Sequence, residues 1–402
     1  MTDDLGMTDD LEWTDTDTFA RALERAETRE KGHCFEDFEV GQRIDHEPGL
    51  TLTRWGNELW TSQTLNHDTR YWRRDVARTH GGKDVARTHG SGPDGTQTRG
   101  SASAADARDG ESGGEELDAP PIHPDYLLAA TLGCTVEDLS EKGGYFLGRT
   151  NVRFPVDGIA PGTDLRVESE VLETKTSRSR PEYGIVTWQT RGYDGDTEET
   201  LCTYERTNMI PRREPASVET DGGSERPPSE QAATPSLPEP FITPGGEAFE
   251  DFEAALETAR GENGVVAYRH ERGRTMDDVT VATLPLATLN TAKQHHNVDA
   301  MANSPSGDIV TYGDVTRSTA LGHARSDERT FREVGFENEQ FHTFVTPGDT
   351  VYCFTRVLET SRETTTANGR AGTVRFEHIA FNQRDEPVYS GTRTAEILTR
   401  DT

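Results

Sequence analysis

The segment TLNTAKQHHN, residues 288–297, gathers side chains that could transfer a proton. It holds Asn290, Lys293 and the adjacent His295 and His296, in a chain of 402 residues with only 12 histidines. A histidine has an ordinary pKa of about 6.5, which suits acid–base chemistry near neutral pH. On a helix, neighbouring residues point about 100° apart, so these two rings would not converge on one metal ion. Taken alone, the segment also fits a solvated helix end whose histidines satisfy backbone carbonyls.

The composition excludes several classes of protein. Acidic residues number 72 against 42 basic ones, which gives a formal net charge of −30. Such a surface repels phosphate backbones, so no nucleic-acid partner is expected. No apolar run reaches the roughly 18 residues of a membrane span, and the first residues lack the features of a signal peptide, so we expect a soluble cytoplasmic protein with no membrane partner. Lysine is rare among the bases, as in proteins that stay folded in molar salt.

The cysteines give no sign of a metal or redox site. They form no CxxC pair and stand far apart, at Cys34, Cys134, Cys202 and Cys353. We therefore expect reduced, partly buried thiols, with no disulfide and no metal. The duplicated stretch DVARTHGGKDVARTHG contains His80 and His89, which we expect to be solvated and inert.

Two stretches rich in Gly, Ser, Pro and Asp interrupt an otherwise patterned chain, at 79–118 and 211–240. Neither has an apolar face, so neither can offset the entropy lost on ordering. The second is expected to link two domains, and the first to be an insert in the first domain. The chain then divides into an N-terminal extension (1–34), a first domain (35–210) and a second domain (241–402).

Outside those stretches, the two halves of the chain resemble each other. Each carries an alternating strand, a Pro-Gly turn and another alternating strand, at 152–178 and 334–363. Shorter motifs repeat in the same order: TLN at 64–66 and 288–290, then AATLG at 129–133 and STALG at 318–322. The spacings in the two halves differ by about the length of the insert. We infer an internal duplication.

Each half is expected to hold a first strand, a helix ending near its TLN motif, a second helix, and three or four long antiparallel strands. In the second half, the segments TVYCFTRVLE, AGTVRFEHIAFNQ and PVYSGTRTAEI alternate with the period of two typical of a sheet with one solvated face. The fold class is therefore α+β, with a curved sheet wrapped around a helix in each half. Two such halves would pair edge to edge into one long sheet.

The doubled layout, the Pro-Gly-Asp-Thr turn, and an Asn and a His five residues apart resemble the double hot dog fold of the MaoC-like hydratases. Within that class, the chain is similar to the mesaconyl-CoA (2-methylfumaryl-CoA) hydratases at NTAKQHHN (290–297), TPGDTVYCFTRVLE (346–359) and FEDFEVGQ (35–42). The resemblance implies a hydro-lyase without a cofactor, which converts mesaconyl-C1-CoA reversibly to β-methylmalyl-CoA. It also implies a homodimer and, with the halophilic composition, a place in the haloarchaeal methylaspartate cycle.

The resemblance assigns the chemistry to the second half. The general hydratase pattern has an Asp and, five residues later, a His; here Asn290 stands at the Asp position and His295 at the His position. Asn cannot act as a base, so His295 is expected to transfer the proton while Asn290 orients water or the ring. Gly313 is expected to supply, at a helix start, the backbone N–H that stabilises the thioester oxyanion. The matching residue of the first half is Pro124, which has no N–H.

The first half offers an alternative site. Aligned through TLN, it has Asn66 but places Tyr71, with an ordinary pKa of about 10, where the histidine would stand. A shift in register would bring His67 or Asp68 into play. We expect one active site, built mainly by the second half and walled by the first, with Asn66, His67 and Asp68 as the alternative.

The substrate that the resemblance implies carries a second, free carboxylate, which needs a cationic partner. Arg317, one turn after Gly313, is the first candidate and Lys293 the second, and Tyr312 is also expected to contact the substrate. Two other functions stay open. One is an (R)-specific hydratase of simple enoyl-CoA esters, which needs no such cation, and the other is a non-catalytic hot dog protein that binds acyl-CoA.

Overall fold

The computed structural model describes residues 12–76, 119–177, 179–216, 237–362 and 370–400. The 79–118 insert, with His80 and His89, and most of the 211–240 linker lie outside the described residues. The strands are β1 (Arg43–Asp45), β2 (Leu50–Thr51), β3 (Tyr145–Arg153), β4 (Asp164–Thr176), β5 (Tyr183–Asp194), β6 (Thr200–Pro211), β7 (Phe241–Ile242), β8 (Val265–Arg269), β9 (Arg274–Thr275), β10 (Thr330–Phe341), β11 (Thr350–Ser361), β12 (Ala371–Phe381) and β13 (Pro387–Leu398). The α-helices are α1 (Thr16–Arg25), α2 (Arg54–Gln63), α4 (Pro124–Gly133), α5 (Val136–Leu139), α6 (Phe249–Glu262), α7 (Asp278–Ala287), α8 (Val298–Met301) and α9 (Gly313–Arg325). Short 3₁₀ turns are η1 (Phe35–Asp37), η2 (Thr69–Tyr71) and η3 (Lys293–His295).

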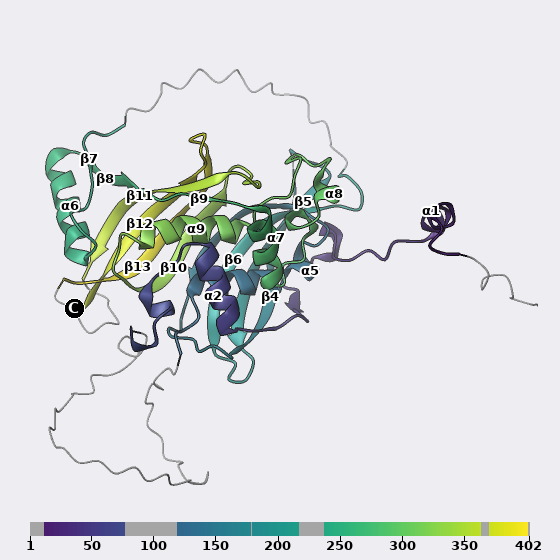
Figure 1. The fold of residues 1–402 in the computed structure, drawn as a ribbon, viewed down its shortest axis with the longest axis horizontal. Helices are drawn as coiled ribbons and strands as arrows, with labels where there is room; N and C mark the ends of the chain where they lie inside the picture. Colours follow the sequence, from purple (N-terminus) through teal and green to yellow (C-terminus); the bar gives the residue numbers. More distant parts are fainter. Residues whose placement is uncertain (1–11, 77–118, 178, 217–236, 363–369, 401–402) are drawn as a thin grey trace, which may run out of the picture.

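Strands from both halves form one continuous sheet (Figure 1). Its order is β1-β4-β5-β6-β3-β10-β13-β12-β11-β8-β7, with β2 paired to β4 and β9 to β11. The pairs are antiparallel except for β7 and β8. The halves meet where β3 pairs with β10 and Val152 lies opposite Phe336. The predicted edge-to-edge pairing of two similar sheets is therefore confirmed.

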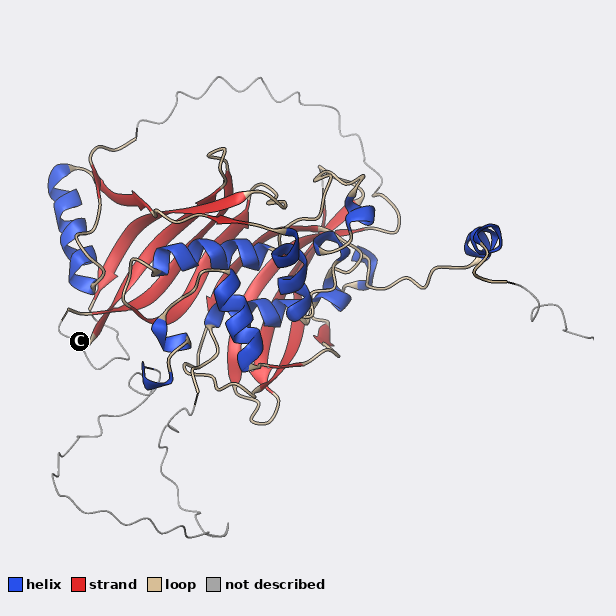
Figure 2. Ribbon diagram, viewed as in Figure 1, coloured by secondary structure: helices blue, strands red, loops and turns tan. Residues whose placement is uncertain are grey.

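The central helices lie together on one face of this sheet (Figure 2). Helix α4 is enclosed almost completely, since every residue from Asp125 to Gly133 is buried. It packs against α2, α7 and α9 as well as against strands β4 and β6. Such a position explains why α4 is largely apolar around its circumference, with Asp125 as the charged exception.

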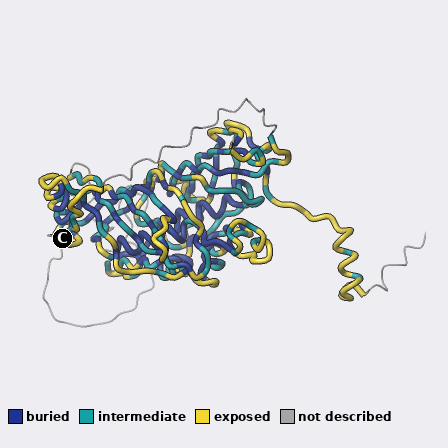
Figure 3. The backbone as a smooth tube through the Cα atoms, turned by 90° about the horizontal axis from the view of Figure 1, so that it is seen from above, coloured by how far each residue is buried: buried dark blue, intermediate teal, exposed yellow. Residues whose placement is uncertain are grey.

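The distribution of burial separates the body of the protein from one exposed arm (Figure 3). The arm ends in α1, which has no buried residue. The four cysteines lie in the body, where all of them are buried and carry free thiols. No helix in the described part of the chain is long and apolar enough to cross a membrane.

The repeated sequence motifs pack on each other across the two halves. A Cβ atom on Gly133 would lie 1.8 Å from the carbonyl oxygen of Thr288, and one on Gly322 would lie 2.3 Å from that of Thr64. No side chain fits there, so each of the two helices needs a glycine where it crosses the TLN turn of the other half. The leucine of each TLN motif has a positive φ, 59° in the first half and 61° in the second, which turns the chain away from the preceding helix.

A buried ion-pair network joins the first half to the second. Asp125 of α4 accepts hydrogen bonds from Arg317, Ser318 and Arg325 of α9, at 2.6 to 2.9 Å. Burial alone would raise the pKa of Asp125, but the two guanidinium groups outweigh it and hold this pKa well below its usual range. The carboxylate therefore stays charged and fixes α4 against α9.

Asp125→Asn should lower the free energy of unfolding by about 3 to 5 kcal/mol, because it leaves buried guanidinium charge without its shared carboxylate. The exposed i,i+4 pair of Arg54 and Glu58 provides a control. Such pairs contribute about 0.5 kcal/mol or less, so Glu58→Gln should hardly change unfolding in denaturant. Equally small shifts in both variants would contradict the role given to Asp125.

Candidate active site

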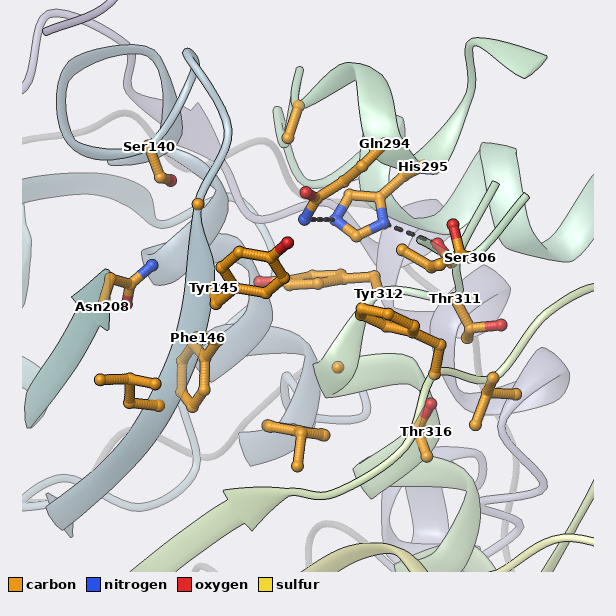
Figure 4. A pocket seen from close by; sticks show the side chains of 18 of the residues that line it. Ser140, Tyr145, Phe146, Asn208, Gln294, His295, Ser306, Thr311, Tyr312 and Thr316 are labelled. Carbon is orange, nitrogen blue, oxygen red and sulfur yellow. Dashed lines mark hydrogen bonds between the residues drawn. The ribbon is translucent and has the colours of Figure 1, made fainter. Parts of the chain in front are cut away.

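A cavity of about 680 Å³ opens between the two halves, within the roughly 300 to 1,000 Å³ typical of small-molecule sites. Figure 4 looks into it, with Gln294 and His295 of η3 on one side and Tyr145, Phe146 and Asn208 of strands β3 and β6 on the other. The second half thus supplies the histidine, and the first half supplies much of the opposite wall.

His295 lies in the 3₁₀ turn η3, not in the helix that the sequence suggested. Helix α7 ends at Ala287, and the positive φ of Leu289 turns the chain before η3 begins. The backbone N–H of His295 donates to the carbonyl of Ala292 at 3.0 Å. This tight turn directs the ring into the cavity, while His296 is exposed and its Nε2 contacts the carbonyl of Thr291 at 2.9 Å.

The contacts of His295 define its protonation. Nδ1 lies 2.7 Å from the carbonyl oxygen of Val310, and because a carbonyl only accepts, Nδ1 carries the proton and donates it. Burial lowers the pKa of His295 to about 4, so the ring is neutral near pH 7. Its Nε2 therefore presents a lone pair, with the side-chain nitrogen of Gln294 at 3.4 Å (Figure 4). A neutral imidazole with a lone pair on Nε2 can accept a proton from water.

Asn290 lines the same cavity and keeps a free donor. Its Oδ1 accepts from the backbone N–H of Ala292 at 3.2 Å, and its amide nitrogen has no hydrogen-bond partner among the described residues. The equivalent Asn66 donates to the carbonyl and hydroxyl of Ser318, both at 3.0 Å. The residue that matches Ser318 in the repeat is Ala129, which has no hydroxyl group. The Asn290 amide can therefore donate to a ligand.

Tyr312 and Gly313 complete this side of the cavity. Gly313 is the first residue of α9 and Tyr312 precedes it as N-cap. The ring of Tyr312 lies 5.5 Å from the ring of His295, centroid to centroid. A Cβ atom on Gly313 would come within 2.7 Å of the ring of Phe341. The free N–H groups at a helix start attract negative charge, so this position can stabilise an oxyanion.

The first half places the same two residue types in reversed order. Tyr71 packs on His123 with ring centroids 4.4 Å apart, and His123 is the N-cap of α4, directly before Pro124. Burial lowers the pKa of His123 to about 3 and raises the pKa of Tyr71 above its usual range. This ring pair offers no helix-start N–H at the proline and does not line the 680 Å³ cavity.

The alternative residues of the first half lie apart from this cavity. Asn66 is buried, and its Oδ1 accepts from Arg325 at 2.7 Å. His67 and Asp68 line a separate cavity of about 430 Å³ together with Arg325. The structure therefore brings Asn290, His295, Tyr312 and Gly313 together and leaves the first-half residues elsewhere.

Neither cation chosen from the sequence lines the cavity. Arg317 is fully buried, bonded to Asp125 at 2.9 Å and Asp314 at 3.0 Å. Its guanidinium lies over Phe336 at 4.9 Å, so it holds helices together and does not face a ligand. Lys293 is exposed at the start of η3 and does not line the cavity either. Contrary to the prediction, neither Arg317 nor Lys293 is placed to bind a substrate carboxylate in this cavity.

Three arginines that the sequence did not single out line the cavity instead: Arg149, Arg180 and Arg206. Arg149 pairs with Asp314 at 2.6 Å and Glu339 at 2.7 Å. Arg180 is exposed and lies over the ring of Tyr145 at 4.6 Å. Arg206 is 1% exposed and pairs with no carboxylate among the described residues. An arginine on the inward face of an alternating strand was the signal available in the sequence.

Solved structures place this architecture in a class. A MaoC domain protein of Chloroflexus aurantiacus matches it with a TM-score of 0.67 at 18% identity, over 93% of this chain and 100% of the other. A Mycobacterium tuberculosis protein with a double hot dog fold gives a TM-score of 0.62 at 16% identity, over 91% and 99% of the two chains. At such low identity the likeness concerns the fold alone. It defines a MaoC-like double hot dog protein, and the predicted α+β fold is confirmed.

Sequence comparison narrows this class to one family. Residues 12–90 and 102–399 match the mesaconyl-CoA hydratase family. The mesaconyl-CoA hydratase of Haloarcula marismortui is 56% identical over 98% of both chains, and that of Haloarcula hispanica is 56% identical over 97% of both. The chain belongs to the mesaconyl-CoA hydratase family, and the prediction of a hydro-lyase is confirmed.

Gly313→Ala should lower the free energy of unfolding by about 1 to 3 kcal/mol, because the added methyl group overpacks against the ring of Phe341. Gly261 of α6 provides the matched control, since a Cβ atom there meets nothing within 4 Å. Gly261→Ala should instead stabilise the helix by up to about 1 kcal/mol. Thermal unfolding of both variants measures the contrast, and stabilisation by both would contradict the close packing at Gly313.

Proposed function

We propose that the protein adds water reversibly to mesaconyl-C1-CoA and so forms β-methylmalyl-CoA. The observation that carries this proposal is one cavity that holds the lone pair of a neutral His295 and the helix start at Gly313. Hydration of a double bond conjugated to a thioester needs a proton acceptor for water and a donor for the thioester oxygen. The high identity to two mesaconyl-CoA hydratases supports the choice of substrate.

In the proposed reaction, His295 moves one proton. Its Nε2 takes a proton from water while the water oxygen bonds to Cβ, and the electrons of the double bond move through Cα onto the thioester oxygen. The backbone N–H of Gly313 donates to this enolate oxygen. The proton on Nε2 then passes to Cα as the thioester carbonyl reforms. Cβ gains OH, Cα gains H, and the imidazole returns to its neutral form.

Asn290 acts here as an orienting group. An amide cannot remove a proton from water, but its unpartnered nitrogen can donate to the oxygen of the attacking water. Its Oδ1 is already held by the backbone of Ala292, so the amide has a fixed orientation. This arrangement explains how a site without a carboxylate at that position still directs water toward Cβ.

We also propose one active site for each chain. The second domain, 241–402, would carry the chemistry, and the first domain, 35–210, would supply the opposite wall from β3 and β6. Arg180, which is exposed and lines the cavity, is the candidate to bind CoA phosphate groups because guanidinium pairs well with phosphate. The homodimer implied by the family resemblance stays a prediction.

Turnover of two thioesters tests the proposed substrate. Mesaconyl-C1-CoA and 2-methylcrotonyl-CoA differ only in a carboxylate or a methyl group on Cβ. We expect the purified enzyme to remove the enoyl-thioester absorbance of the first and to leave the second nearly unchanged. Faster turnover of the neutral ester would instead support a hydratase of simple enoyl-CoA esters.

His295→Ala should lower kcat on mesaconyl-C1-CoA by a factor on the order of 10² or more, because general acid–base groups contribute about 10² to 10⁴-fold. His296→Ala is the matched control, since that ring is exposed and contacts only a backbone carbonyl. It should leave kcat unchanged. Retention of wild-type kcat by a folded His295→Ala enzyme would move the site elsewhere.

The pH dependence of kcat/KM should report the low pKa of His295. The active form is the neutral ring, so activity should stay level from neutral pH to about 5 and fall as the pH drops through about 4. The burial of a neutral ring also costs stability below the unfolded pKa of about 6.5, because only the unfolded chain gains the proton there. Circular dichroism must therefore show folded enzyme at each pH. A midpoint near 6.5 in folded enzyme would contradict this assignment.

A further inference from the structure

Arg206 of β6 carries a buried positive charge without a partner. Its side chain is 1% exposed, and Nε and Nη2 are buried without any hydrogen-bond acceptor. Its guanidinium carbon lies over the ring of Trp188, 5.3 Å from the ring centroid. Burial without a carboxylate lowers the pKa of Arg206. Because Arg206 lines the cavity, a ligand bound there can approach this unpaired side chain.

The internal repeat supplies a reference for this residue. In β13, Arg393 lies opposite Phe336 of β10, as Arg206 lies opposite Arg149 of β3. Arg393 also sits 5.3 Å from an aromatic ring, that of Phe376 on the neighbouring strand. The two arginines therefore occupy equivalent places in the two halves.

Their electrostatic surroundings differ. Arg393 donates to Glu333 and Glu328 at 2.7 to 2.8 Å, so its charge is neutralised within the protein. Two residues after each arginine, Ala395 lies opposite Glu333 and Asn208 lies opposite Phe146. Phe146 is therefore the equivalent of Glu333. The first half has thus exchanged a carboxylate for a phenyl ring beside its buried arginine. Next to it, Oδ1 of Asn208 is also buried without a partner.

The other arginines of the cavity are less suited to a buried anion. Arg149 already binds Asp314 and Glu339, and Arg180 is exposed to solvent. An unpaired buried charge is costly, and a carboxylate placed against it gains a strong charge-assisted interaction. The cavity is therefore prepared for one anionic group at Arg206.

We propose that Arg206 binds the free carboxylate of the acyl group and so selects CoA esters of dicarboxylic acids. This proposal rests on the proposed function, because it assigns the second carboxylate of that substrate. The substrate carboxylate lies beside Arg206 as the Glu333 carboxylate lies beside Arg393. Because Arg206 neutralises the carboxylate on Cβ, this group repels the neighbouring enolate less as the enolate forms.

Binding of two saturated thioesters tests the proposal apart from turnover. The C1 thioester of 2-methylsuccinate has the free carboxylate, 2-methylbutyryl-CoA has a methyl group instead, and neither can be hydrated. By calorimetry, Arg206→Met should raise the Kd of the first on the order of 10²-fold and change the second little. An equal loss for both esters would assign Arg206 to the CoA portion and overturn the proposal. Because neither ester reacts, failure of the hydration assay leaves this result readable.

A pair of variants at Phe146 provides the converse test. Phe146→Glu introduces the carboxylate that Arg393 has, whereas Phe146→Gln changes size and packing similarly without adding charge. Both lose the contact with the ring of Phe341, 5.2 Å away. The Glu variant should bind the carboxylate ester at least tenfold more weakly than the Gln variant, with similar binding of the neutral ester. Equal binding of the carboxylate ester by both would count against the proposal.

The stability of the ligand-free enzyme gives a readout that does not depend on any ligand. Arg206→Met removes an unpaired buried charge and should raise Tm, because an apolar side chain is better tolerated there. Arg393→Met leaves Glu328 without its arginine and should lower Tm. A fall in Tm as large for Arg206→Met as for Arg393→Met would show that the protein already satisfies Arg206, and would overturn the proposal.

Discussion

The ion-pair contact between α4 and α9 is the constraint on which the rest of the molecule depends. Asp125 of α4 binds Arg317 and Arg325 of α9. Ion pairs with defined geometry fix both the distance between two helices and the position of each helix along its axis. Since α9 begins at Gly313, this contact also sets where the helix start faces His295. The stability of the core and the geometry of the site therefore share one physical cause.

The two halves keep one backbone plan and differ in a few decisive side chains. His295 faces Tyr312 at the start of α9, whereas Tyr71 faces His123 at the start of α4. The core of each half tolerates either order because both pairs fill a similar volume. A proline at the start of α4 then removes the N–H group that the other helix keeps. Duplication has thus preserved the packing in both copies, while the helix start with a free N–H group occurs in the second copy and is replaced by Pro124 in the first.

Features that depend on local sequence could be predicted, whereas features that depend on tertiary contacts could not. The long strands of both halves and the turns between them could be predicted, because alternation and turn residues are local features. The alignment of Gly313 with Pro124 was also correct, since each begins a helix. Arg317 was misassigned because helical spacing shows which residues share a face but not what that face meets. Arg206 was missed because it lacks a carboxylate partner only through the presence of Phe146 on the neighbouring strand. The register between two strands is not a local property of the sequence.

The burial of these charges separates two effects of dissolved salt. A net charge of −30 produces repulsion across the surface, which mobile ions screen over a Debye length of about 3 Å at 1 M salt. Ions do not enter the contacts of Asp125 or Arg149, because these side chains are buried among protein atoms. Ionic strength therefore acts on whether the chain stays folded, while the arrangement of the helices around the cavity, once formed, is nearly independent of the solvent's ion content.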